Sequence, residues 1–146
     1  MSDVDPAEVA ARFRTALIPL TRALRTQVEG DMTPSLMSAL ATVAREGPVT
    51  LGDLAGAEKV TPPMATKLAN GLEERGLVER TQGVDDRRIF RLALAPKGRA
   101  VLDRAATRRN AWLARRLKDL SEDELAQLAA AVEVIEHINR HEGPGR

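Results

Sequence analysis

The side chains best suited to chemistry lie in residues 61–75, a stretch that the sequence predicts to be helical. Thr61 can cap its start, Pro62 fits the first helical position, and Gly76 can end it in a left-handed conformation. Helical spacing assigns four apolar residues to the buried side: Ala65, Leu68 and Leu72, with Met64 beside them. It leaves four others facing outward: Pro63, Thr66, Lys67 and Asn70. Threonine, lysine and asparagine can pair with base edges in the DNA major groove, although any surface helix presents polar residues outward.

A second candidate region is the charged turn Asp85-Asp86-Arg87-Arg88, which joins two runs of strand character, residues 77–81 and 88–94. These runs predict a β-hairpin. An arginine at a hairpin tip can enter the narrow minor groove of DNA, where the potential is most negative. We therefore expect Arg87 and Arg88 to contact DNA, with Asp86 orienting Arg88 because phosphates repel a carboxylate. A solvated turn with internal salt bridges explains the same composition.

The elements that must position these residues lie on either side of them in the chain. Thr33-Pro34 starts a helix that Gly47-Pro48 ends, and Thr50-Leu51-Gly52-Asp53 offers a capping box for a short helix through Lys59. Val60 is then the turn before the next helix, which gives the outline of a helix-turn-helix. Followed by a hairpin, this arrangement is a winged helix. We expect an α+β, mostly α fold, with the winged helix-turn-helix at residues 33–95.

Helices with apolar stripes are predicted on both sides of the winged helix. The first begins at Asp5-Pro6 with Glu8 completing a capping box, and Pro19 predicts a kink or break near residues 15–19. Two more helices are expected after residue 96, the second starting at a capping box at Ser121 and ending near residue 141. The stripes repeat at spacings of three and four: Ala10, Phe13, Leu17, Leu20 and Leu24, then Leu125, Leu128, Val132 and Ile135. Such seams suit partner helices, so residues 5–28 and 97–141 are predicted to form a homodimer within a single domain of residues 1–146.

The composition favours a globular protein without membrane segments. Apolar residues make up 43% of the chain and charged residues 29%, and no apolar run approaches the roughly 20 residues that a membrane span needs. The acidic start does not resemble an export signal, so we expect a cytoplasmic protein. The net charge is only +1, so nucleic-acid binding must be argued from the basic strip in mid-chain: Arg75, Arg80, Arg87, Arg88 and Arg91.

Several motifs resemble the MarR family of winged helix-turn-helix regulators in order and spacing. They are Asp53-Leu54-Ala55, the run LEERGLVER at residues 72–80, Asp86-Arg87-Arg88 six residues later, and Leu94-Ala95-Pro96-Lys97-Gly98. The resemblance implies a homodimeric repressor that binds a pseudo-palindromic operator in double-stranded DNA and releases it when a small ligand binds. It assigns DNA contacts to the start and exposed face of one helix, and to the hairpin: Thr61, Pro63, Thr66, Lys67 and Asn70, with Arg87 and Arg88.

The chain departs from the family pattern at two positions. The family usually has threonine where this chain has Ala95, so the following helix lacks a hydroxyl cap, at a cost of about 1 kcal/mol that Pro96 can partly offset. Pro19 alters the first helix, and with it the dimer surface that the resemblance implies.

Two other functions are possible for a chain of this composition. An enzyme needs a positioned nucleophile, base or metal, and the chain has no Cys, no Tyr and two histidines, His137 and His141. Their spacing of four permits a shared metal, but no third ligand is evident, so no catalytic residue, metal or cofactor is expected. The second alternative is a winged helix that binds protein rather than DNA; the charged hairpin and the scarcity of apolar anchors argue against it.

A small-molecule effector, anionic or aromatic, is the remaining expected partner. The candidate cations to receive it lie on the first helix and on the helix after the hairpin: Arg12, Arg22, Arg104, Arg108, Arg109, Arg115 and Arg116. The sequence does not choose among them. Trp112 is expected to serve packing rather than ligand stacking.

Overall fold

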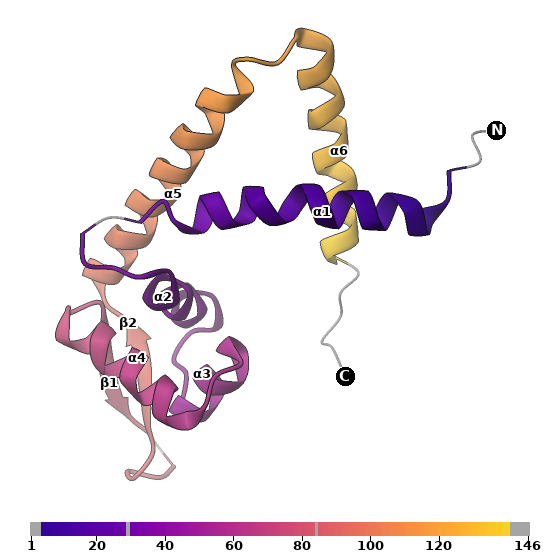
Figure 1. Ribbon diagram of the computed structural model, residues 1–146. Coiled ribbons are helices and arrows are strands. Elements are labelled where there is room, and N and C mark those ends of the chain that lie inside the picture. Colours follow the sequence, from indigo (N-terminus) through magenta and orange to yellow (C-terminus); the bar gives the residue numbers. More distant parts are fainter. Residues whose placement is uncertain (1–3, 29, 84, 141–146) are drawn as a thin grey trace. The chain divides into compact units, whose positions relative to one another are not determined.

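The computed structural model describes residues 4–28, 30–83 and 85–140 (Figure 1). Along the chain these residues form the following elements: α1 (Pro6–Arg25), α2 (Pro34–Glu46), α3 (Leu51–Glu58), α4 (Pro62–Glu74), β1 (Val78–Gln82), β2 (Phe90–Leu94), α5 (Pro96–Leu117) and α6 (Glu122–Arg140). The chain divides into two units, residues 1–109 and residues 110–146. The predicted α+β winged-helix class is confirmed.

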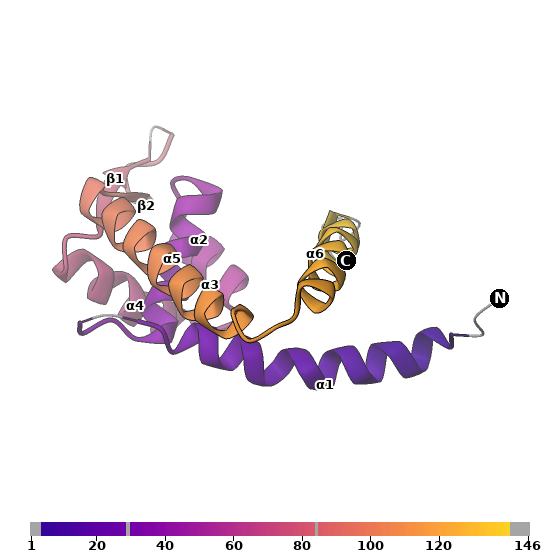
Figure 2. The ribbon, with the colours of Figure 1, turned by 90° about the horizontal axis from the view of Figure 1, so that it is seen from above.

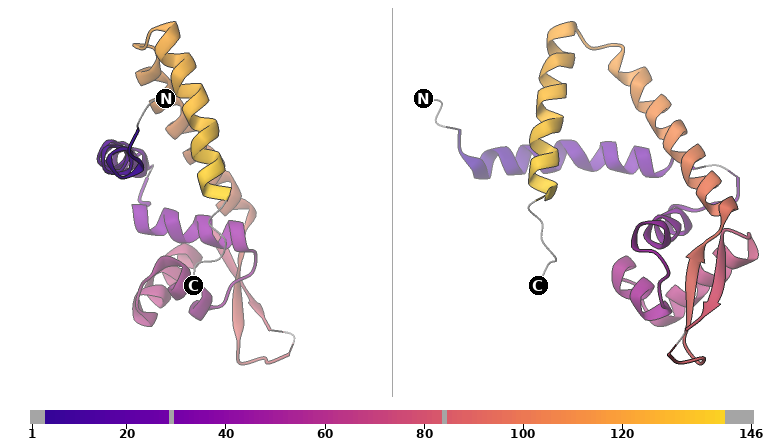
Figure 3. Two further views of the ribbon diagram at one scale, coloured as in Figure 1. Left: turned by 90° about the vertical axis from the view of Figure 1, so that its right-hand side faces the viewer. Right: turned by 180° about the vertical axis from the view of Figure 1, so that it is seen from behind.

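The first unit contains the winged helix. β1 and β2 pair antiparallel with Val78 opposite Leu94 and Gln82 opposite Phe90. Figures 2 and 3 show α2, α3 and α4 gathered beside this hairpin, whose tip extends beyond them. The largest fully buried side chains come from α2, α3, α4 and β2 and from the residue before β1: Leu40, Val43, Leu54, Leu72, Leu92 and Leu77. One hydrophobic core therefore holds the three helices and the hairpin together.

The predicted starts of α2, α3 and α4 are confirmed, and a local cap sets each of them. Thr33 accepts a hydrogen bond from the Leu36 amide at 3.2 Å, and Thr61 accepts one from the Met64 amide at 3.4 Å. Thr50 and Asp53 form the expected capping box, each side chain accepting from the other's amide. Such caps satisfy amides that have no partner within the helix.

A carboxylate fixes α3 against α2. Glu58, at the end of α3, accepts hydrogen bonds from Ser38 Oγ at 2.7 Å and from Thr42 Oγ1 at 2.6 Å. Thr42 is only 2% exposed, so this contact also satisfies a buried hydroxyl. The turn that follows, where Lys59 adopts a left-handed φ of 54°, leads directly to α4. The α2–α3 contact therefore helps to set the position at which α4 starts.

A close approach of two backbones joins the hairpin to α5. A Cβ atom added at Gly98 would lie 2.2 Å from the carbonyl oxygen of Leu77. The same carbonyl accepts a hydrogen bond from the Ala95 amide at 3.0 Å. The glycine in the motif at residues 94–98 is thus required by packing, and the Ala95 side chain is buried rather than placed as a cap.

Four details of the sequence prediction need correction. Of the kink or break predicted near residues 15–19, the break is wrong, because α1 continues through Pro19, where the lost backbone bond lies on an exposed helix. The same helix ends at Arg25 rather than at residue 28. Met64 is 43% exposed, since it lies roughly a quarter of a turn from the centre of the buried stripe, which Ala69 completes. β2 begins at Phe90, so Arg88 belongs to the turn and not to the strand.

The apolar stripes of α1 and α6 contribute no side chain to the buried core of the described residues. No residue of either helix is buried. The exposed apolar side chains include most of the stripes, namely Phe13, Leu17 and Leu20 on α1, and Leu125, Leu128 and Val132 on α6. Leu24 and Ile135, the last residue of each stripe, are half-buried. Leaving so much apolar surface in water is unfavourable.

Candidate nucleic-acid interface

Helix α4 has an exposed polar face and, on its opposite side, an apolar face that is buried in the core. Ala65, Leu68, Ala69 and Leu72 are buried beneath it. The four residues predicted to face outward are all exposed, as is Thr61 at the N-cap: Pro63, Thr66, Lys67 and Asn70. Thr66 donates its hydroxyl hydrogen to the Pro62 carbonyl at 3.1 Å, so its methyl group and oxygen lone pairs remain for a partner. The face is therefore a row of small and polar groups on a rigid helix.

Arg80 on β1 contacts this face from the side. Its Nη2 donates to Asn70 Oδ1 at 3.0 Å, and its Nε donates to Glu73 Oε2. The guanidinium carbon also lies 4.1 Å from the centroid of the Phe90 ring on β2. Sequence reasoning treated Arg80 only as part of a basic strip. The structure shows instead that it connects α4 to both strands of the hairpin.

The hairpin tip places its arginines in solvent. Asp86 Oδ1 accepts from the Arg88 amide at 2.9 Å and from Arg88 Nε at 3.3 Å, which is the contact that the sequence suggested. The Arg88 side chain is nevertheless 91% exposed, and Arg87 is exposed as well. The turn is tight at Gly83, where an added Cβ would lie 2.8 Å from the Asp86 carbonyl oxygen. The tip can therefore offer positive charge without rearranging the core.

The five arginines of the basic strip fall into two groups. Arg75 pairs with Asp31 at 3.0 Å and Arg80 pairs with Glu73, so their charges are largely compensated within the protein. Arg88 also pairs with Asp86, but its side chain is 91% exposed, against 27% for Arg75 and 38% for Arg80. Arg87 and Arg91 are exposed on the hairpin as well. Hydrogen bonds from the backbone and side chain of Thr50 lower the pKa of Asp53, and the charge of Arg91 lowers it further. The positive surface is thus narrower than the sequence suggested and lies on the hairpin.

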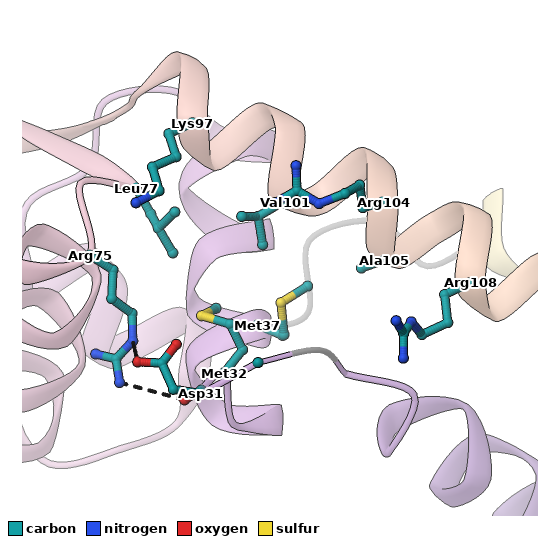
Figure 4. Close-up of a pocket in the computed structure, with 11 residues that line it drawn as sticks. Asp31, Met32, Met37, Arg75, Leu77, Lys97, Val101, Arg104, Ala105 and Arg108 are labelled. Atoms are coloured by element: carbon teal, nitrogen blue, oxygen red, sulfur yellow. Dashed lines mark hydrogen bonds and ion pairs between the residues drawn. The ribbon is translucent and has the colours of Figure 1, made fainter.

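A cavity of about 460 Å³ lies beside the end of α4 (Figure 4). Three cationic side chains of α5 line it, Lys97, Arg104 and Arg108. Met32 and Met37 contribute thioether groups between α2 and α5. Arg75, the C-cap of α4, and its partner Asp31 complete one wall. Cations next to polarisable apolar groups suit a small anion that has an aromatic or apolar body.

The structure also bears on the other candidate groups. Arg109 donates to the Leu24 carbonyl at 3.2 Å, and Arg116 lies 3.7 Å over the ring of Trp112, which is 9% exposed. His137 is on α6, whereas His141 lies outside the described residues. Among the residues with described positions, no cluster of three potential metal ligands is found. Within the same residues, no helix has the length and apolar character needed to cross a bilayer.

The fold and the exposed helix define the class as a winged helix-turn-helix protein, and comparison with known proteins identifies the family. The MarR family model matches residues 32–90. An HTH-type transcriptional regulator of Mycobacterium bovis is 33% identical over 92% of this chain and 94% of its own length. The HTH-type transcriptional repressor MdtR of Bacillus subtilis is 30% identical over 84% of this chain and 83% of its own.

A solved structure gives the same result for the fold. A transcriptional regulator protein from Pseudomonas aeruginosa superposes with a TM-score of 0.81 at 31% identity, covering 94% of this chain and 96% of its own. The chain belongs to the MarR family, as the motifs at residues 53–98 indicated.

Proposed function

We propose that this protein is a transcriptional regulator, a repressor, that binds double-stranded DNA in a sequence-dependent way. The observation that carries the proposal is the exposed face of α4, with Thr66, Lys67 and Asn70 supported by four buried residues. These side chains can donate to or accept from base edges in a major groove. The arginines at the hairpin tip would then contact the adjacent minor groove or its phosphates. Such a protein acts where the DNA is, so we expect it in the cytoplasm.

We further propose that the protein binds as a homodimer. The stripes of α1 and α6 are apolar and exposed in the single chain, which is the pattern of helices that pack against another copy. In a two-fold symmetric dimer, the two α4 helices would enter successive major grooves, about 10 base pairs apart. The DNA site would then be an inverted repeat. On this proposal, residues 5–28 and 97–141 serve dimerisation and residues 33–95 read DNA.

The cavity beside α4 supports regulation by a small anion. Of the cations that the sequence left as equal candidates, Arg104 and Arg108 line the cavity, together with Lys97. A bound carboxylate would lie near Arg75, which caps α4, so binding there can alter the helix that reads DNA. Benzoate is a simple probe of this site. It is expected to weaken DNA binding by the native protein and to have less effect on Arg104→Met, with Arg12→Met on α1 as the matched control.

Selection of bound duplexes from random DNA tests the main proposal. The expected result is an inverted repeat whose half-sites lie about one helical turn apart, bound with a strong dependence on salt. Sedimentation at micromolar concentration should give a dimer. The alternative function, a winged helix that binds protein, predicts no preference for any duplex even at low salt. That outcome, or a stable monomer, would overturn the corresponding part of the proposal.

A further inference from the structure

We infer that Arg80 is a positioning residue that fixes the orientation of the Asn70 side-chain amide and so sets the base preference at the position that Asn70 reads. This inference rests on the proposed function, because it assumes that α4 enters a groove of DNA. Arg80 lies on strand β1, outside both the exposed face of α4 and the hairpin tip. The inference gives this strand residue a role in sequence recognition.

Three contacts hold the Arg80 guanidinium in one plane. Nη2 donates to Asn70 and Nε donates to Glu73, both on α4. The central carbon of the group, Cζ, lies 4.1 Å from the Phe90 ring centroid. A planar guanidinium can make two directed hydrogen bonds and stack on an aromatic ring at the same time, whereas a lysine ammonium acts as a point charge. The position of Arg80 is therefore well defined by neighbours from two elements.

The consequence for Asn70 follows from donor and acceptor chemistry. A guanidinium group has donors and no acceptor, so the amide atom that faces Arg80 must be the oxygen. The Asn70 NH2 group then points away from Arg80 and is available to a base, and the second lone pair of Oδ1 is available too. An asparagine without such a neighbour can turn its amide over, exchanging donor for acceptor. With Arg80 in place, Asn70 offers a single hydrogen-bonding pattern to a base.

Exposure indicates that this network serves orientation more than folding. The Arg80 and Glu73 side chains are 38% and 40% exposed. Ion pairs at such positions add little to stability because water screens them. Fixing a side chain before it binds has a different benefit, since less conformational entropy is lost on binding. Glu73 also compensates the charge of Arg80, which makes a purely electrostatic role in DNA binding less effective.

A double-mutant cycle tests the inference. Arg80→Gln, Asn70→Ala and the double variant are compared on the selected duplex and on a scrambled duplex of the same length. Arg80→Gln is expected to lower the ratio of the two affinities by roughly 2- to 10-fold, within the range for residues in contact. In the Asn70→Ala background, the same substitution should leave the ratio unchanged. Arg80→Lys keeps the positive charge, so it should bind the scrambled duplex as the native protein does. It should recover only part of the ratio of the two affinities that Arg80→Gln loses.

Arg91→Gln, on the paired strand, is the matched control, because it removes one positive charge without touching Asn70. It should weaken both duplexes alike. Repeating the duplex selection with Arg80→Gln should broaden the preference at one symmetric pair of positions. If Arg80→Gln lowers the ratio equally with and without Asn70, Arg80 acts on DNA directly and the inference is wrong.

Two further measurements separate other outcomes. The side-chain amide resonances of Asn70 should shift in DNA-free Arg80→Gln, and unchanged resonances would contradict the hydrogen bond itself. If Arg80→Gln does not fold, Glu73→Ala, which removes only one of the contacts to Arg80, takes its place in the same cycle. A native protein that prefers no duplex would overturn the proposed function and this inference together. A native protein that has a preference but shows no coupling would overturn this inference alone.

Discussion

Helix α4 and the hairpin tip differ in how their exposed residues are held. Beneath the polar face of α4, four buried residues anchor the helix, and Arg80 fixes Asn70 from the side. At the tip, Arg88 is 91% exposed and is held by Asp86. Reading a hydrogen-bonding pattern requires a fixed orientation, whereas contact with a phosphate requires mainly charge within reach. Helix α4 is therefore suited to reading base edges, and the hairpin tip is suited to contacting phosphates of the same duplex.

The largest expected effect is on folding. Leu72→Ala should lower the free energy of unfolding by about 2 to 5 kcal/mol, because it leaves a cavity under α4. Ile89→Ala, at a tip residue that is 47% exposed, should change it by less than about 0.5 kcal/mol. Urea denaturation measures both. Equal losses at the two positions would contradict the comparison between a helix anchored in the core and an exposed tip.

The next effect concerns sequence preference. Asn70→Ala should cost about 1 to 3 kcal/mol of binding free energy on the selected duplex, since a base contact is lost. Binding to a scrambled duplex should hardly change, because no charge is removed. Fluorescence anisotropy at one salt concentration gives both values. If Asn70→Ala weakened both duplexes equally, α4 would be contacting only the DNA backbone.

A smaller effect is expected at the start of α4. Thr61→Ala removes the side-chain acceptor for the Met64 amide and should lower the free energy of unfolding by about 1 kcal/mol. Thr66→Ala is a suitable control, because its hydroxyl donates to a carbonyl of its own helix and caps no amide. Thermal melting should separate the two variants. An equal loss from both would mean that the cap contributes nothing specific.

At the hairpin tip, Arg88→Ala should weaken binding to the selected and scrambled duplexes by the same factor. An exposed ion pair is worth roughly 0.2 to 1 kcal/mol, which sets the size of the loss. The slope of log K against log salt should become less steep by about 0.9, the value for one phosphate contact. Arg88→Lys should keep the slope. A loss limited to the selected duplex would give the tip a reading role and break the comparison.

The smallest expected effect is a pH dependence at α3, which precedes α4. Hydrogen bonds from Thr50 lower the pKa of Asp53 in the folded state, so its carboxylate stabilises the fold above the unfolded-state pKa, near 3.8. This stabilisation is lost as pH falls through the lowered pKa. Native protein should therefore be more stable than Asp53→Ala near neutral pH, and the difference should shrink under acid conditions. Urea denaturation between pH 7 and pH 3 measures it; a difference that grows at low pH would contradict the sign.

Sequence reasoning succeeded where the cause of a structural feature is local. Thr33, Thr50 and Thr61 cap helices through amides three residues away, and Gly47 and Gly76 end helices with left-handed φ values of 76° and 70°. The exposed face of α4 follows from helical periodicity alone. These features need no knowledge of tertiary structure.

Features that depend on distant residues were missed. Glu58 binds Ser38 across 20 positions, Arg75 binds Asp31 across 44, and Arg80 meets α4 only once the hairpin is formed. One signal for Arg80 was present in the sequence. Arg80 pairs with Leu92, so the two side chains lie on the same face of the hairpin. Phe90, two residues before Leu92, lies on that face too and is the diagonal neighbour of Arg80. Finding that register from the sequence would have required the exact limits of the turn, and the predicted strand began two residues too early.

Gly98 has a mechanical consequence. Where side chains separate two elements, a small displacement of one can be absorbed by rotamer changes, but two backbones in direct contact have no such compliance. Because the first turn of α5 lies against the Leu77 carbonyl, it cannot shift toward β1 without pushing Leu77 and the chain that leads back through Gly76 to α4. A shift at the start of α5 toward β1 would therefore be passed on to the segment that ends α4.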